Sequence, residues 1–450
     1  MRLFRSWHTQ VEVWKQSSVN RKILSSTLTI AGATLLVKFA SIVKEMLIAD
    51  RFGTGDDLDA FLIAFLLPQF LVNVIAGSFA ATIVPSLIIS TEKDGLIATR
   101  RLMRECLLLV FLLLSGSAIF LALAMPLLLP LLSSGFSVQK YALSGQLYML
   151  LLPVIIVNGM AVFYGAVLNS QNKFWLPSVL PAITPFAIIL VLLQFVTNIY
   201  GVAWGMLAGC VIELMFIILV LHRSGWPVLP RWHGMLPSTQ LAIRQYTPMI
   251  AGTFMVSGAT IINQAMAATL EPGSVSALNY GNKVFALVSG LGAGALGTAV
   301  LPFFSKQVAQ GDWAGARHTL GRYTRLLLYI TIPTTVFCII FSEWIIRILF
   351  EHGLFNAQDT RMVALVQSAY FVQIPFYLLG ILGARMLNAM QSNQVLLKIA
   401  LVSLIANVMG NWLLMKIMGV AGIALSTSIA YLLSCAMIFY SLRRTLVAKG

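Results

Sequence analysis

The chain has few charged residues, and few acidic ones in particular. Of its 450 residues 10% are charged, with 15 Asp and Glu against 30 Lys and Arg, whereas 59% are hydrophobic. Soluble domains carry about 25% charged residues, so this composition excludes a soluble globular fold. The apolar excess requires a bilayer, in which each run of about 20 apolar residues is a candidate span.

Residues that build disulfides, metal sites or catalytic centres are scarce and scattered. The four Cys lie in apolar segments without close spacing, and the five His are spread over the tail and loops, which argues against a disulfide framework or a metal site. Neither a P-loop nor a GxSxG elbow occurs. Gly292, Gly294 and Gly297 spell GxGxxG, but no strand precedes them, so they predict close helix packing or a hinge. We expect a transporter without a cofactor rather than an enzyme, and the source of energy, a coupling ion or the membrane potential, stays open.

Long apolar segments are the abundant feature, and they predict about twelve transmembrane helices. The spans run approximately over 23–48, 60–90, 106–132, 142–168, 176–197, 201–221, 246–270, 275–304, 323–342, 362–386, 395–415 and 419–441. Most Lys and Arg fall in the termini and in every second loop, and the other loops hold more than half of the acids. By the positive-inside rule both termini are cytoplasmic. The basic start of the chain, without a cleavage site after the first apolar run, predicts a retained first helix.

The two halves of the sequence repeat each other. Pro85 follows Ala60 by 25 residues, and Pro302 follows Ala277 by the same interval, 217 positions further on. Later segments align at nearly the same offset, GAVLNSQNK from 165 with GARMLNAMQSNQ from 383 and GVAWG from 201 with GVAGI from 419. We therefore predict an all-α polytopic membrane protein with two parallel-repeat six-helix lobes around a central cavity. The expected divisions are a basic N-terminal segment (1–22), an N-lobe (23–221), a cytoplasmic linker (222–243), a C-lobe (244–442) and a cytoplasmic tail (443–450).

Three lysines, Lys38, Lys44 and Lys283, fall inside predicted spans. A lysine at the centre of a span costs about 2.5–3.5 kcal/mol on insertion scales, so each needs an explanation. One interpretation is that their long side chains reach a membrane interface. The favoured interpretation is a cationic cavity for an anionic head group, for which a diphosphate fits three lysines better than a cation does. Glu45, next to Lys44, can neutralise one of these charges.

Glu213 is the other charge inside a span. Gly201, Gly205, Gly209 and Glu213 recur every four residues and share one helix face, and small residues at this spacing mark helix contacts in membranes. Glu213 is therefore expected to face protein. A structural hydrogen bond to a neighbouring helix and a proton or cation site are equally open interpretations.

The segment RFGTGDDLDAFLIAFLLPQFL at 51–71, followed by GSFAATIVPSL at 77–87, resembles the signature of the MurJ/MviN lipid flippases of the multidrug/oligosaccharidyl-lipid/polysaccharide exporter superfamily. The segments 273–306 and 168–174 are similar to the same family. The resemblance implies a transporter that moves an undecaprenyl-diphosphate-linked saccharide, typically the peptidoglycan precursor lipid II, between the leaflets of the bacterial cytoplasmic membrane.

The resemblance also assigns roles to residues. It matches the family's cavity arginines to Lys38, Lys44 and Lys283, which keep the charge but lose the bidentate guanidinium, and it matches Asp59 to an aspartate at the start of the second helix. Two positions depart from the family, Val72 for an arginine and Ala76 for a glutamate. Twelve rather than fourteen helices are expected, without the last pair that helps to form a groove for the lipid tail. These departures leave a surface-polysaccharide precursor as an alternative substrate.

The leading hypothesis is therefore a flippase that works by alternating access, with membrane lipids and a polyprenyl-diphosphate saccharide as ligands. Glycan-synthesis enzymes are its implied partners, and nucleic acid is not expected. The competing hypothesis is a cation-coupled multidrug exporter of the same superfamily, in which Glu45 or Glu213 is the coupling acid. A membrane scaffold without transport is the least favoured, because its buried charges would then serve no purpose.

Overall fold

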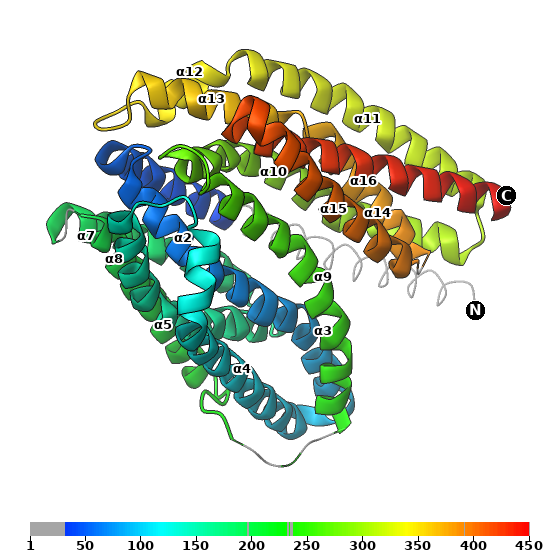
Figure 1. The fold of residues 1–450 in the computed structure, drawn as a ribbon. Helices are drawn as coiled ribbons and strands as arrows, with labels where there is room; N and C mark the ends of the chain where they lie inside the picture. Colours follow the sequence, from blue (N-terminus) through cyan, green and yellow to red (C-terminus); the bar gives the residue numbers. More distant parts are fainter. Residues whose placement is uncertain (1–31, 196–197, 232–233, 235–236, 391, 450) are drawn as a thin grey trace, which may run out of the picture. The chain divides into compact units, whose positions relative to one another are not determined.

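A computed structural model describes residues 32–449 except 196–197, 232–233, 235–236 and 391, and every regular element in this part is helical (Figure 1). A first helix, described over 32–52, precedes the others. Those of the first half are α2 (Asp56–Leu71), the π-helical turn η1 (Val72–Gly77), α3 (Ser78–Lys93), α4 (Gly95–Leu132), α5 (Val138–Ser170), α6 (Trp175–Val179), the 3-10 turn η2 (Leu180–Ala182), α7 (Ile183–Gln194) and α8 (Ile199–Arg223). Those of the second half are α9 (Pro237–Ala267), α10 (Ser274–Ala309), α11 (Trp313–Ile340), α12 (Ser342–Phe350), α13 (Ala357–Phe371), α14 (Ile374–Ala389), α15 (Asn393–Met418) and α16 (Val420–Lys449).

The described residues contain ten helical segments that are long and apolar enough to cross a membrane. The first helix and α10 lie where the first and eighth spans are predicted. The all-α polytopic fold class is therefore confirmed. The cavity expected between the lobes stays a prediction.

The sequence repeat is visible in where helices begin. Helix α4 begins at Gly95 and α11 at Trp313, 218 residues later, and α5 begins at Val138 and α13 at Ala357, 219 residues later. Equivalent helices thus start at equivalent positions, at the offset that the sequence motifs share. This agreement supports two copies of one ancestral unit.

Two predicted spans have a more complex backbone than a single α-helix. The span over 60–90 is helical throughout, but the π-turn η1 separates α2 from α3. The span over 362–386 is interrupted after Phe371 and resumes as α14, with Pro375 in the first turn, where its missing N–H costs nothing. Pro375 therefore marks a helix start, whereas Pro68, Pro85, Pro153 and Pro333 lie inside helices.

The chain forms two compact units. One consists of the described residues up to Lys44 together with Ile75–Gly116 and Pro153–Tyr246, and the other of Glu45–Val74, Ser117–Leu152 and the described residues from Thr247 onward. The divisions fall within helices, for example within α4, α5 and α9.

In the second unit α16 packs against α13, α14 and α15 (Figure 1). Polar side chains link α9, α15 and α16 inside this apolar packing. The Asn411 amide donates to Asn263 Oδ1 at 2.7 Å, and both Asn263 and Asn407 donate to Thr427 Oγ1, at 3.1 and 3.2 Å. Hydrogen bonds of this kind hold helices together where no hydrophobic driving force acts between them.

In the first unit the glycine face of α8 packs directly against α7. An added Cβ on Gly205 would lie 2.6 Å from Ile188 Cα, and one on Gly209 would lie 2.6 Å from Thr184 Cα. The missing side chains thus permit close contact between the two helices. One turn further on, Glu213 Oε2 accepts a hydrogen bond from Thr184 Oγ1 at 3.4 Å.

We predict that Gly209→Ala destabilises the protein, because the new methyl group would collide with the α7 backbone. Overpacking of this kind costs about 1–3 kcal/mol, which should lower the midpoint of thermal unfolding in detergent. Gly116→Ala in α4 is the matched control, since nothing lies within 4 Å of its added Cβ. Equal losses of stability in the two variants would contradict the α7–α8 contact.

Candidate functional site

The lysine of α10 is held by an ion pair. Lys283 Nζ lies 2.8 Å from Glu45 Oε1 on the first helix, and both residues belong to the second unit. The Glu45 side chain is only 11% exposed, whereas the Lys283 side chain remains 43% exposed. The sequence suggested that Glu45 neutralises one of the lysines, with Lys44 as its neighbour in the chain. The structure pairs Glu45 with Lys283, which is 238 positions away.

The other two lysines lie on the first helix within the first unit. The Lys38 side chain is exposed and Lys44 is half-buried. Because the three lysines belong to different units, their assembly into one diphosphate site stays a prediction.

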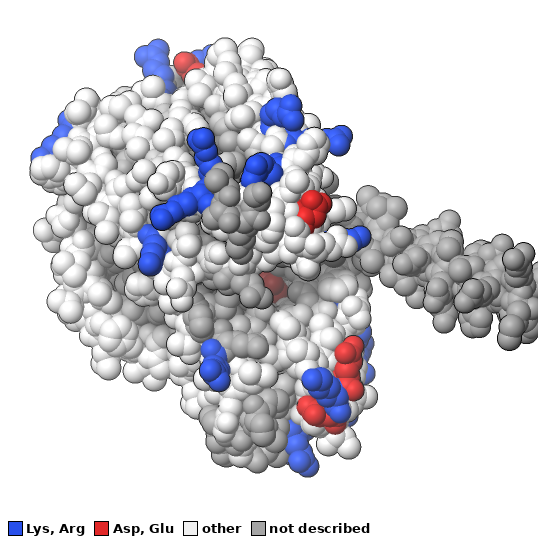
Figure 2. Space-filling model, turned by 90° about the vertical axis from the view of Figure 1, so that its right-hand side faces the viewer, with Lys and Arg blue, Asp and Glu red and all other residues white. Residues whose placement is uncertain are grey.

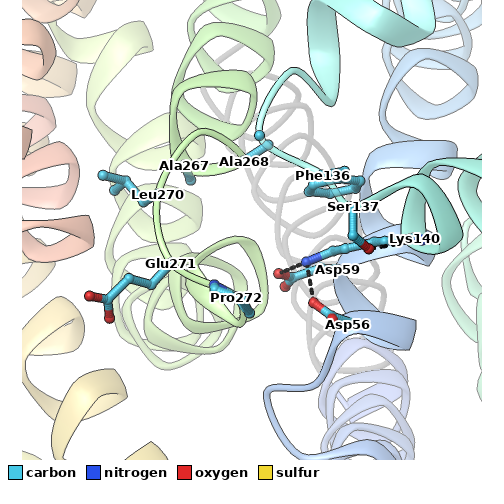
Figure 3. A pocket seen from close by; sticks show the side chains of 11 residues that line it. Asp56, Asp59, Phe136, Ser137, Lys140, Ala267, Ala268, Leu270, Glu271 and Pro272 are labelled. Atoms are coloured by element: carbon cyan, nitrogen blue, oxygen red, sulfur yellow. Dashed lines mark hydrogen bonds and ion pairs between the residues drawn. The ribbon is translucent and has the colours of Figure 1, made fainter.

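A second polar group joins α2, α5 and α10, and we call it the Asp59 cluster: Asp56, Asp59, Lys140, Gly273 and Ser276. Figure 3 shows the three charged members, Asp56, Asp59 and Lys140. Lys140 Nζ lies 2.8 Å from Asp59 Oδ2 and 2.7 Å from Asp56 Oδ1. Asp59 also accepts hydrogen bonds from the backbone N–H of Gly273 at 2.9 Å and of Ser276 at 2.7 Å, and from the Ser276 hydroxyl. Its carboxylate is thereby fully compensated, although Asp59 is only 1% exposed.

The start of α10 is shaped to receive this carboxylate. Free N–H groups and the positive end of the helix dipole favour an anion there. Gly273, which precedes α10, has a φ of +86°, and an added Cβ would lie 2.5 Å from the Thr54 carbonyl oxygen. Only glycine fits this backbone comfortably. Asp59 and Ser276 are 217 positions apart, which is the offset of the repeat, so equivalent positions of the two halves contact each other.

A small cavity of about 140 Å³ adjoins the Asp59 cluster. The Lys140 ammonium lies 4.2 Å from the centroid of the Phe136 ring, and Glu271 points away from the ion pairs (Figure 3). A water molecule takes about 30 Å³ in the liquid. The cavity therefore has room for a few waters but not for a saccharide, and we assign the cluster to positioning the helices rather than to binding substrate.

A second connection between the halves lies next to the Asp59 cluster. The Thr54 hydroxyl donates to Asp359, and the Leu354 N–H donates to the Asp50 carbonyl oxygen at 2.8 Å. Asp359 is the third residue of α13 and belongs to its capping box. Glu351 lies in the loop before α13. A hydrogen bond from the Thr360 hydroxyl, in the first turn of α13, lowers the pKa of this carboxyl group. The segment 50–59 is thus bonded to the starts of both α10 and α13.

Sequence reasoning found Asp59 but not its partners. It assigned Lys140 to a loop on the non-cytoplasmic side, and it gave no role to Gly273 or Ser276. The repeat offset of 217 places Ser276 opposite Asp59, and that signal could have identified the pair. No pattern in the sequence links Lys140 to Asp56.

The glycines that spell GxGxxG lie within α10. An added Cβ on Gly292 would lie 2.8 Å from the Leu378 side chain of α14, so this glycine is at a helix contact. The surroundings of Gly294 and Gly297 lie outside the described part of the chain. Their role as a hinge stays a prediction, as does a proton or cation site at Glu213.

The described helices define an all-α polytopic membrane protein, and solved transporter structures share its fold. A solved lipid II flippase MurJ in an inward closed conformation matches with a TM-score of 0.79 and 23% identity, covering 92% of this chain and 87% of that one. An inward-facing multidrug resistance MATE transporter matches with a TM-score of 0.77 and 12% identity, covering 94% and 98%. These likenesses show the fold.

The sequence comparisons identify the family. The model of the family described as lipid II flippase MurJ matches residues 48–450, so the chain belongs to this family. A probable lipid II flippase MurJ of Rhizobium tropici is 25% identical, with 94% of this chain and 81% of the relative covered. The lipid II flippase MurJ of Burkholderia cenocepacia is 27% identical, with 94% and 84% covered. The chain is therefore a multi-pass inner-membrane transporter of the lipid flippase class and not an enzyme.

We predict that Asp59 and Lys140 are energetically coupled. Asp59→Asn leaves a buried ammonium with one carboxylate fewer, and breaking a buried pair from one side costs about 3–5 kcal/mol. Each single variant, Asp59→Asn and Lys140→Gln, should lower the thermal midpoint, and the double variant should lose less than the sum of the two. Additive losses in this double-mutant cycle would show that the pair is not coupled.

Proposed function

We propose that the protein translocates an undecaprenyl-diphosphate-linked saccharide across the bacterial cytoplasmic membrane by alternating access, with both termini in the cytoplasm. The family suggests lipid II, the peptidoglycan precursor, and a related surface-polysaccharide unit is the alternative substrate. The observation that carries the proposal is the pairing of Lys283 with Glu45, because it keeps a cation inside a membrane-spanning segment while leaving its ammonium partly accessible.

A diphosphate suits this arrangement chemically. Its oxygens compete with the Glu45 carboxylate for the Lys283 ammonium. Substrate binding therefore replaces one anionic partner of the lysine by another, and the ammonium keeps an ion pair throughout. The Lys283 side chain is 43% exposed, so a second anion can reach it although Glu45 is buried. Lys38 and Lys44 supply the further positive charge in this proposal.

Alternating access requires contacts that form in one state and break in another. The Asp59 cluster and the Thr54–Asp359 hydrogen bond provide such contacts, because they join segments from the two halves of the sequence through a few polar groups. Breaking them exposes Asp59 and Lys140 to water, which can solvate both charges. We assign these contacts to the closed gate on the non-cytoplasmic side.

We predict opposite effects on substrate binding at the two members of the Lys283–Glu45 pair. Glu45→Gln should tighten binding of undecaprenyl diphosphate by up to about five-fold, because it removes the competing carboxylate. Lys283→Gln should weaken binding and abolish flipping of lipid II in proteoliposomes. Native mass spectrometry measures the binding, and protection of a fluorescent lipid II analogue measures the flipping.

Lys306→Gln is the matched control, since it removes the same charge from the exposed end of α10. Unchanged binding and flipping in Lys283→Gln would refute the assigned role of the lysine. Binding of organic cations, with loss of their export in Glu213→Gln, would instead favour the multidrug exporter.

We predict that Gly273→Ala opens the non-cytoplasmic gate. The methyl group would collide with the Thr54 carbonyl and move the start of α10 away from Asp59. A cysteine in place of Ala277, which is fully buried, should then react about ten-fold more with an impermeant maleimide added from outside. A destabilisation of the closed state by about 1.4 kcal/mol suffices for this change.

Gly311→Ala controls for backbone strain alone, because Gly311 also has a positive φ but nothing lies within 4 Å of its added Cβ. Labelling that rises equally in both variants, or in neither, would contradict the gate.

A further inference from the structure

A groove of about 380 Å³ runs between α11 and α16. On α11 it is lined by Arg317, Gly321 and Thr324, and on α16 by Leu442, Arg443 and Leu446. The residues on α11 are four and three positions apart, and those on α16 fall within about one helical turn, so each set forms one face. One arginine comes from each helix, and the remaining wall is mostly apolar.

A glycine on α11, Gly321, contributes to the open space of the groove. Nothing lies within 4 Å of a Cβ added to Gly321, in contrast to Gly205 and Gly209, whose missing side chains are covered by a neighbouring helix. The space above Gly321 is therefore not filled by any described part of the chain. An apolar group from outside can occupy it.

The two arginines give one end of the groove a positive charge. The Arg317 guanidinium donates through Nη2 to the Leu446 carbonyl oxygen at 2.8 Å, which holds it at the end of α16. Among the described residues no carboxylate forms an ion pair with Arg317 or Arg443. Figure 2 looks onto the side on which the C-terminal end of α16 lies, and basic side chains outnumber acidic ones in its upper part.

A polar group inside the groove is also without a partner. The Thr324 hydroxyl is buried and has no hydrogen-bond partner among the described residues, although such groups are normally satisfied. A threonine hydroxyl can donate to a phosphate or an ester carbonyl. The groove thus combines two arginines without a carboxylate partner among the described residues, a donor without an acceptor and an apolar wall, which together match a lipid rather than a soluble anion.

We propose that this groove binds a phospholipid with an anionic head group, from the leaflet that the distribution of basic residues predicts to be cytoplasmic. Arg317 and Arg443 contact the phosphate, the glycerol backbone lies over Gly321 against Leu442, and Thr324, about one turn deeper on α11, donates to an ester carbonyl oxygen. Basic pockets between transmembrane helices on the cytoplasmic side bind anionic head groups in this way. The site is distinct from Lys283 and Glu45, and it does not depend on which saccharide is carried.

The test compares lipid retention by the full-length protein in native mass spectrometry, with phosphatidylglycerol and phosphatidylcholine of the same acyl chains as probes. We expect the wild type to retain phosphatidylglycerol in preference to phosphatidylcholine. At about 1 kcal/mol for each basic residue near the head group, Arg317→Gln with Arg443→Gln should weaken phosphatidylglycerol binding by about 25-fold. Gly321→Leu should abolish binding while leaving the fold intact, because its side chain enters open space.

The control pair, Arg322→Gln with Arg444→Gln, removes two exposed charges from the same helices outside the groove. An equal loss in this pair would show diffuse surface attraction and overturn the proposal. Equal retention of the two lipids by the wild type, or unchanged binding in Gly321→Leu, would also overturn it. Displacement of phosphatidylglycerol by excess farnesyl diphosphate would assign the groove to the transported lipid instead.

Discussion

Buried charge must be compensated where it lies, and the Asp59 carboxylate shows what this requires. Because Asp59 is only 1% exposed, its carboxylate depends on Lys140 and on the N–H groups of Gly273 and Ser276. These donors come from α5 and from the start of α10. The hydrogen bonds and the ion pair of the Asp59 carboxylate therefore fix where the starts of α2, α5 and α10 lie relative to each other. They also explain why a glycine with a positive φ stands at the start of α10.

The Lys283–Glu45 pair meets the same constraint in a different way. Both members of the Asp59–Lys140 pair are buried, so separating them while they remain dry is costly. The Lys283 side chain is 43% exposed, so another anion can approach it while Glu45 is in place. The degree of burial thus separates the two roles that we propose and that the sequence cannot distinguish: a contact that holds helices together until the gate opens, and a cation that is available to a ligand.

The sequence predicted the helices because the bilayer imposes a strong and local requirement, about 20 apolar residues for each span. It predicted the repeat because the same residues recur at a nearly constant offset, and it predicted that the glycines before Glu213 mark a helix contact. It did not predict that Lys140 reaches Asp56 and Asp59, since this contact depends on how α2 and α5 meet. Pro375 indicated an interruption of its span, and the structure ends α13 at Phe371 and begins α14 just before this proline.

The glycines on α8 and α11 show that a small residue in a membrane helix can serve different structural purposes. Gly209 and Gly321 both lie on helical faces that contact a neighbour, and both lack a side chain for packing. At Gly209 the backbone of α7 fills the space, so the glycine brings two helices together. At Gly321 the space stays open beside two arginines and an unpaired hydroxyl. In a bilayer, an apolar space that the protein leaves open is available to lipid. The arginines beside it then select lipids by the charge of their head group.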